Sequence, residues 1–107
     1  MSEDTGFTLA GPISRQPIPR TPHLVEGRRY RVWLRIGWIS QGSVCVWVGG
    51  NRTDFFTTAG EHIQQVVAGE RPDAAVQGLN AEARIEGVAI SDAADEPLRR
   101  GDPGPAP

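Results

Sequence analysis

The nine residues Tyr30 to Trp38, YRVWLRIGW, decide the fold expected for this chain. Their apolar and aromatic side chains recur at every second position, and the positions between them hold Arg31, Trp33 and Arg35. An alternation with a period of two is typical of a β-strand that buries one face. The buried face is expected to consist of Tyr30, Val32, Leu34, Ile36 and Trp38.

A second strand is expected at residues 43–49, joined to a first strand at residues 29–39 by three residues that end in Gly42. A three-residue loop with glycine in the left-handed conformation is a common hairpin connection. The register with this loop length keeps the apolar positions of both strands on one face, whereas a shift by one residue would mix the faces. The predicted hairpin also places Arg35 opposite Trp47, where a cation–π contact contributes about 0.5–1 kcal/mol.

Further short strands are expected along the chain, separated by turns rich in glycine, and no segment has a convincing helical period. These strands are predicted at residues 53–58, 62–68, 75–79 and 82–91. Many short strands at close spacing are typical of an all-β sandwich or barrel. We therefore predict a small antiparallel β-sandwich, jelly-roll-like, with an extended N-terminal arm and an irregular C-terminal tail.

The two ends of the chain differ in composition from its centre. Residues 1–27 contain four prolines, which lack backbone donors and favour extended backbone before them, so this arm is expected to be extended. Residues 92–107 are acidic, then basic, then rich in glycine and proline, which is a composition typical of disorder. The predicted organisation is an arm (1–27), a β-sandwich domain (28–91) and a tail (92–107).

Charge and composition exclude several classes of protein. The formal net charge is −2 and the sequence pI is about 5.6, whereas a nucleic-acid-binding protein usually has a basic excess. No apolar run approaches the ~20 residues that span a bilayer, and the first residues lack the basic region of a signal peptide. We expect synthesis in the cytoplasm, no signal peptide and no contact with nucleic acid or membrane.

Catalytic and metal-binding patterns are weak. The histidines, His23 and His62, do not accompany a nucleophile or a carboxylate pair in a known arrangement, and His62 is expected to be a half-buried strand residue. Cys45 is the single cysteine, so an internal disulfide is excluded and a buried, inert thiol is expected. The acidic residues near 92–96 lack the spacing of a calcium loop. We therefore expect no enzymatic activity, no metal and no cofactor.

Four segments in residues 26–91 carry a resemblance to a known family: EGRRYRVWLRI, GSVCVWVGG, TTAGEHIQQVVAG and LNAEARIEGVAIS. In this order they resemble the carbohydrate-binding-module-like jelly-roll sandwiches of phage and gene-transfer-agent accessory proteins. The closing strand departs from the family pattern, because it has Glu86 where aspartate is frequent. The resemblance implies a structural subunit of a phage-like particle, either a head-spike base or a capsid decoration. Capsid or other particle proteins, sister subunits in a ring, and a spike or fibre would be its partners.

Two sets of residues are candidate binding sites. The arm is expected to dock on a partner, because an extended segment without regular donors suits a groove or an added edge strand. Its candidate contacts are Phe7, Leu9, Pro12, Ile13, Pro17, Ile18, Pro19 and Pro22. The second set is the outward face formed by Arg31, Trp33, Arg35 and Trp47.

Three interpretations of that outward face remain open from the sequence. Tryptophan and arginine together are enriched at the centres of protein interfaces, which favours a protein contact. The same residues suit a platform for a polysaccharide, as in a carbohydrate-binding adhesion module. In the third interpretation the tryptophans pack under the arm or a second sheet, since strand tryptophans are usually packing residues.

Overall fold

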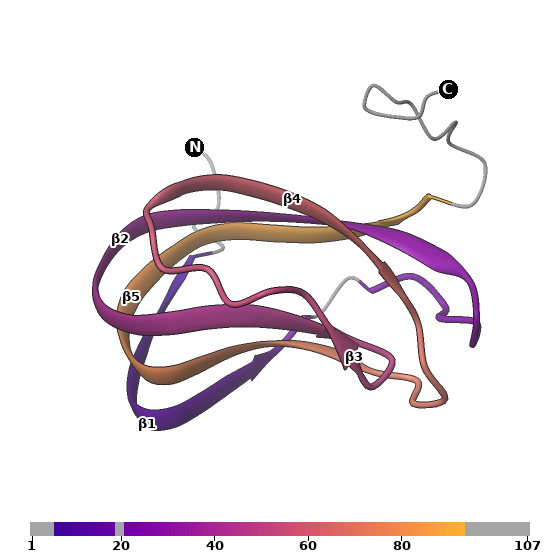
Figure 1. Ribbon diagram of the computed structural model, residues 1–107, viewed down its shortest axis with the longest axis horizontal. Coiled ribbons are helices and arrows are strands. Elements are labelled where there is room, and N and C mark those ends of the chain that lie inside the picture. The colour runs from indigo at the N-terminus through magenta and orange to yellow at the C-terminus, as the bar shows by residue number, and fades with distance from the viewer. Residues whose placement is uncertain (1–5, 19–20, 94–107) are drawn as a thin grey trace.

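The computed structural model describes residues 6–18 and 21–93, which form one antiparallel sheet of five strands. The strands are β1 (Phe7–Pro17), β2 (Arg29–Val48), β3 (Asn51–Arg52), β4 (Gly60–Val67) and β5 (Ala74–Asp92). The sheet order is β1-β5-β2-β3, and β4 pairs with the first part of β2. The prediction of a small, all-β, antiparallel sandwich is confirmed (Figure 1).

Two long paired strands, β2 and β5, bend sharply in the middle, and their two halves form the two layers of the sandwich. β2 has 20 residues and β5 has 19, and they pair from Tyr30–Asp92 at one end to Val48–Ala74 at the other. The register between them shifts repeatedly over residues 35–43 of β2, and Figure 1 shows both strands turning back on themselves at this point. Register irregularities of this kind bend a strand and increase its twist.

The two halves of the bent sheet form two facing layers. The β4 layer contains β4, residues 29–36 of β2 and residues 85–92 of β5. The β3 layer contains β3, residues 43–48 of β2, residues 74–79 of β5 and the end of β1. Residues 53–56 run along the open side of the β3 layer, where Phe56 exchanges two backbone hydrogen bonds with Val44.

The predicted hairpin between residues 29–39 and 43–49 is wrong. Arg35 pairs with Gly87 rather than with Trp47, and Trp47 pairs with Ala75 and Arg52. Gly42 has the positive φ expected for it, 76°, but lies where β2 bends and not in a chain reversal. The two halves of β2 still face each other across the core, because both layers turn their even-numbered β2 residues inward.

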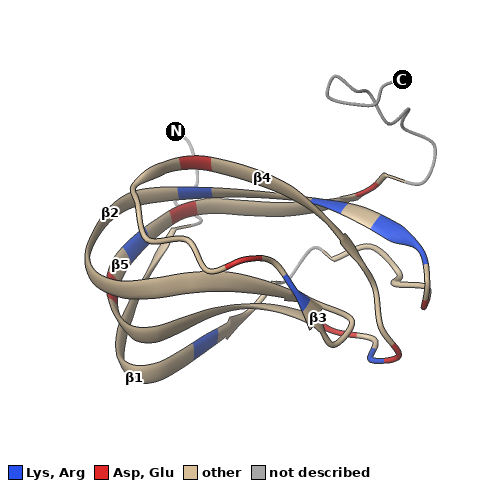
Figure 2. Cartoon of the chain, viewed as in Figure 1, with Lys and Arg blue, Asp and Glu red and all other residues tan. Residues whose placement is uncertain are grey.

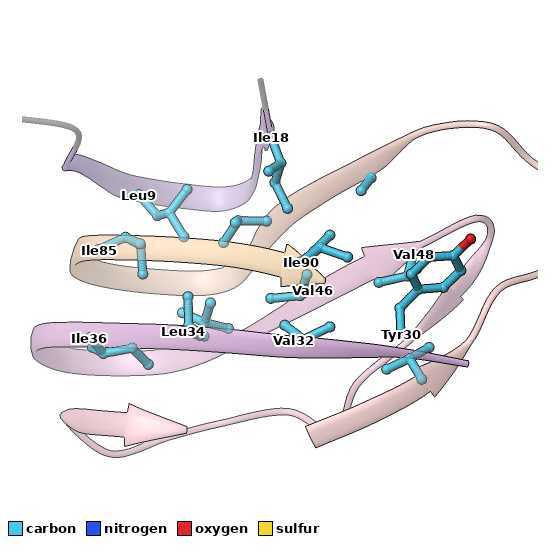
Figure 3. Packing of buried hydrophobic residues seen from close by; sticks show 14 of the residues in the cluster. Leu9, Ile18, Tyr30, Val32, Leu34, Ile36, Val46, Val48, Ile85 and Ile90 are labelled. Atoms are coloured by element: carbon cyan, nitrogen blue, oxygen red, sulfur yellow. The ribbon is translucent and has the colours of Figure 1, made fainter. Parts of the chain in front are cut away.

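The core lies between the two layers (Figure 3). Four of the five inward residues predicted in the opening stretch are fully buried, and so are alternate residues of the second half of β2. The buried β2 side chains of this cluster are Tyr30, Val32, Leu34, Ile36, Val44, Val46 and Val48. Trp38 is the exception and is 49% exposed, because the register shift between Ile36 and Trp38 breaks the alternation.

The structure places much of the predicted arm in the sheet. β1 is extended as expected, but it pairs with β5 from Phe7–Ile85 to Pro17–Ala75, so residues 7–17 are a strand of the sandwich rather than a separate arm. Leu9 and Ile18 are buried in the same core as the strands. Removal of this segment would therefore expose the core.

Other predicted boundaries change for related reasons. The strand predicted at 62–68 is confirmed as β4, but 53–58 contains a single bridge residue, Phe56, and β3 ends before it. The strands predicted at 75–79 and 82–91 are one strand, because β5 continues through Asn80 in a left-handed conformation. Asp92 is the last residue of β5, Ala93 follows it, and the rest of the predicted tail lies outside the described residues.

Candidate functional site

The outward face predicted from the sequence is divided between two layers. Trp33 lies on the first half of β2 and Trp47 on the second half, and both point away from the inward residues next to them. Because the two layers face each other across the core, their outer surfaces lie on opposite sides of the sandwich (Figure 1). The structure therefore brings Arg31, Trp33 and Arg35 together but separates them from Trp47.

We call the outer surface of the β4 layer the Trp33 face. It includes the outward side chains of β2 and β4 at Arg31, Trp33, Arg35, Glu61, Ile63, Gln65 and Val67. The indole ring of Trp33 lies over Gly87, where a Cβ atom would come within 2.7 Å of the ring, and its N–H donates to the Glu61 carboxylate. Glycine at position 87 thus lets the ring lie flat against the sheet.

Charged residues on the Trp33 face alternate in sign near the bend. Arg35 Nε donates to Glu86 Oε1 at 3.1 Å, and Glu61 lies opposite Arg35 on the neighbouring strand. In Figure 2 the negative, positive and negative segments of β4, β2 and β5 lie in a row there. Both partners of the Arg35–Glu86 pair are about half exposed, so the pair adds little to stability.

Large apolar side chains are exposed on the Trp33 face. Ile63 lies directly opposite Trp33 on β4 and is 54% exposed, and Val67, on the same face, is 48% exposed. Neither residue was predicted as a candidate from the sequence, although burial alternates along β4 as it does along β2. The run Ile-Gln-Gln-Val-Val does not show which set faces inward, and the structure buries Val66 instead of Val67.

We call the outer surface of the β3 layer the Trp47 face. Arg15 Cζ lies 5.7 Å from the centre of the Trp47 ring, and its Nη1 donates to Gln77 Oε1 at 3.3 Å. The Trp47 indole N–H donates to the same oxygen. Arg15, from the predicted arm, thus occupies the cation–π position that the sequence assigned to Arg35.

A second guanidinium group lies near the Trp47 face. Arg52 is the cross-strand neighbour of Trp47, and its Cζ lies 4.2 Å from the centre of the Phe55 ring. Within the described part of the chain, no carboxylate forms an ion pair with Arg15 or Arg52. The Trp47 face therefore combines an aromatic ring, an amide and two arginines without a compensating acidic side chain.

The candidate contacts of the arm are dispersed. Leu9 and Ile18 are buried in the core, Phe7 packs against it, and Pro22 is half-buried. Pro12, Ile13 and Pro17 are exposed along β1, with Ile13 69% exposed. Pro19 lies outside the described residues.

The Cys45 thiol and the His62 ring, which could carry chemistry, are both held in packed surroundings. Burial raises the pKa of the Cys45 thiol, while Arg52, Arg15 and a hydrogen bond with Trp47 act in the opposite direction. His62 is half-buried in β4, as predicted; it stacks on Phe56 with ring centres 4.4 Å apart and contacts the Thr58 carbonyl oxygen at 2.8 Å. A buried thiol with a raised pKa is a poor nucleophile.

The described residues show neither a metal-binding cluster nor a helix that could span a membrane. These residues contain no group of three or more histidine, cysteine, aspartate or glutamate side chains arranged to hold a metal ion. No helix in the same residues is long and apolar enough to cross a membrane. The arrangement offers surfaces for binding, and the Trp33 and Trp47 faces are its two candidates.

Comparison of the chain with protein-family models, with curated protein sequences and with solved structures finds no match.

Proposed function

We propose that this protein is a non-enzymatic structural subunit of a phage-like particle of the gene-transfer-agent type, a head-spike base or capsid decoration. The sequence resemblance supplies the kind of particle, and the Trp33 face supplies the contact with a neighbouring particle protein. The observation that carries the proposal is the exposure of Ile63, opposite Trp33, and of Val67 on the same outer surface.

The composition of the Trp33 face suits a protein partner. Interface centres are enriched in aromatic residues and arginine, and the Trp33 face places Trp33 between Arg31 and Arg35. The apolar side chains of β4 extend this centre, while Glu61 and Glu86 give it a polar margin. A face of this kind loses its exposed apolar area when a subunit docks on it, which favours assembly.

A second candidate function is binding of a polysaccharide at the Trp47 face, as in a carbohydrate-binding adhesion module. The observation in its favour is the contact among Arg15, Trp47 and Gln77, which places a guanidinium and an amide next to an aromatic ring. An aromatic ring can stack on the apolar side of a sugar ring, and the polar groups can bond its hydroxyls. The two functions use opposite surfaces, so one chain could perform both.

We expect Trp33→Ala to reduce incorporation of the subunit into purified particles by about 30-fold, and Trp47→Ala to leave it unchanged. Loss of an interface hot spot costs about 2 kcal/mol or more, which corresponds to this change in affinity. Incorporation is measured by quantitative mass spectrometry of particles from cells in which the variant replaces the normal chain. Val67→Glu is a second variant, because it adds a charge to the Trp33 face and leaves the packing of Trp33 on Gly87 intact.

Folding and sugar binding are measured on the same variants. Thermal unfolding of each isolated chain shows that the variant is folded, and retention on host polysaccharide should be lost in Trp47→Ala but kept in Trp33→Ala. Normal incorporation of folded Trp33→Ala and Val67→Glu would overturn the assembly proposal. Unchanged retention of Trp47→Ala, or no retention of the normal chain, would overturn the carbohydrate proposal.

A further inference from the structure

The free edges of the sheet differ in the features that prevent them from pairing with another chain. β1 forms one edge, since it pairs with β5 alone. Pro12 and Pro17 lack backbone donors, Arg15 adds a charge, and Gly11 has a φ of 102° that interrupts regular strand geometry. Proline, charge and local distortion are devices by which edge strands avoid pairing with another chain. The prolines of the N-terminal segment thus protect the β1 edge.

β4 forms another edge, and there these devices are confined to its first two residues, Gly60 with a φ of 115° and Glu61. It pairs with β2 on one side, and Figure 1 shows it at the margin of its layer. Its eight residues, GEHIQQVV, include no proline, lysine or arginine, and its register with β2 runs without a shift from Ile36–Gly60 to Arg29–Val67. Glu61 is its one acidic residue, and that carboxylate accepts the Trp33 N–H.

The direction of the β4 backbone groups follows from one hydrogen bond at its end. The Ala68 N–H donates to the Arg28 carbonyl at 2.9 Å, toward β2, in the register of the β2–β4 ladder. Antiparallel strands alternate between residues that bond the neighbour and residues that do not. His62, Gln64 and Val66 therefore bond β2, and the backbone groups of Glu61, Ile63 and Gln65 point to the open side. At the end of β4, Asn51 Nδ2 donates to the Val67 carbonyl at 2.7 Å, so this carbonyl is already hydrogen-bonded within the chain.

We propose that this edge pairs with the β4 edge of a second copy of the chain, antiparallel across a two-fold axis at Ile63. Ile63 of each copy then faces the other, and Glu61 of each lies opposite Gln65 of the other. All six side chains lie on the outer surface, as required when two sheets join edge to edge with the same face outward. The β4 layers of the two copies become one continuous sheet.

Other registers are less favourable. A two-fold axis at Glu61 would place two carboxylates directly opposite each other, which destabilises a strand pair. An axis at Gln65 would require the Val67 carbonyl, which already accepts the Asn51 hydrogen bond. Axes at the intervening residues would pair Ile63 with a polar side chain instead of with itself. Pairing at Ile63 avoids these costs.

A second copy is favoured over an unrelated strand because this edge is complementary to itself. The pairing joins apolar to apolar side chains at the axis and an acid to an amide on each side. It also brings the Trp33–Ile63 pairs of the two copies together, because Trp33 lies opposite Ile63 in each copy. This inference deepens the proposed function and rests on it for the role of the pair in an assembly, but the pairing itself is measured on the isolated chain.

The experiment is sedimentation of the full chain over a range of concentrations. We expect a mass of twice the 11.6 kDa chain that falls to the single mass on dilution. Ile63→Lys places like charges opposite each other and should raise the dissociation constant at least about tenfold. Gln65→Pro removes an N–H that points away from β2, so it should abolish the pair and keep the β2–β4 ladder. Ile13→Lys, on the proline-containing β1 edge, is the matched control and should leave the dissociation constant unchanged.

A normal chain that stays monomeric at every concentration would overturn the inference, as would folded Ile63→Lys and Gln65→Pro variants that dimerise like the normal chain. An equal loss of dimer in Ile13→Lys would also overturn it, because the contact would then lie elsewhere. Particle incorporation is a separate measurement, made on the Trp33→Ala and Val67→Glu variants. The failure of the proposed function can therefore be distinguished from the failure of this inference.

Discussion

Leu34→Ala is expected to lower the free energy of unfolding by about 2–5 kcal/mol, the usual range for a large-to-small change in a packed core. Leu34 is fully buried at the centre of the β4 layer, where β2 pairs with β4 on one side and β5 on the other. A small domain has a total stability of about 5–15 kcal/mol, so this loss is a large fraction of it. Chemical denaturation followed by tryptophan fluorescence measures the change.

Ile63→Ala is the matched control for Leu34→Ala. Ile63 belongs to the same layer but lies on its outer surface, 54% exposed, so its truncation leaves no cavity. We expect a change below about 1 kcal/mol, because substitutions at the surface usually have small effects. Similar losses from the two variants would contradict the assignment of the inward and outward faces of this layer.

Gly42→Ala is expected to lower the free energy of unfolding by more than about 2 kcal/mol. A left-handed backbone alone costs a residue with a side chain about 1–2 kcal/mol, and Gly42 has such a backbone at the bend of the sandwich. Gly42 has a φ of 76°, and a Cβ atom there would lie 2.2 Å from the Asn80 carbonyl oxygen. That oxygen belongs to the backbone of β5, so it cannot move without shifting the strand pair at the bend. The measurement is the change in denaturation midpoint and unfolding free energy.

Gly27→Ala is the control that distinguishes the steric contact of a new Cβ atom from the cost of a positive φ. Gly27 has a similar φ of 85°, but a Cβ atom there would meet nothing within 4 Å. Its substitution should therefore cost only the backbone term of about 1–2 kcal/mol. Equal losses at positions 27 and 42 would mean that Gly42 does not lie against β5, which would contradict the folded-over arrangement of the two long strands.

The alternation in residues 30–36 was sufficient to predict the inward face, because each layer buries the same parity of β2 residues. It could not identify the pairing partner. A hairpin and a bent strand place the same residues inward, and the true partner of β2, residues 74–92, is distant in sequence. Gly42 was correctly predicted to have a positive φ, but a local turn preference does not show whether a chain reverses or bends.

The binding faces were harder to predict for the same reason. Trp33 and Trp47 were correctly placed on outward positions, but a hairpin puts them on one surface and the bent strand puts them on two. Arg15 was missed because four prolines suggested a separate arm, whereas prolines are tolerated at an edge strand, as β1 shows. Trp38 was misplaced because the register shifts at the bend end the alternation one residue before it.

The separation of Trp33 and Trp47 onto opposite outer surfaces is the claim on which both proposed functions depend. It is tested most directly by the through-space proton contacts of the Trp47 backbone in the NMR spectrum of the full chain. Contacts of Trp47 with Ala75 on one side and Arg52 on the other are the predicted result. Contacts of Trp47 with Arg35, without those to Ala75, would contradict the folded-over sheet and merge the two faces into one.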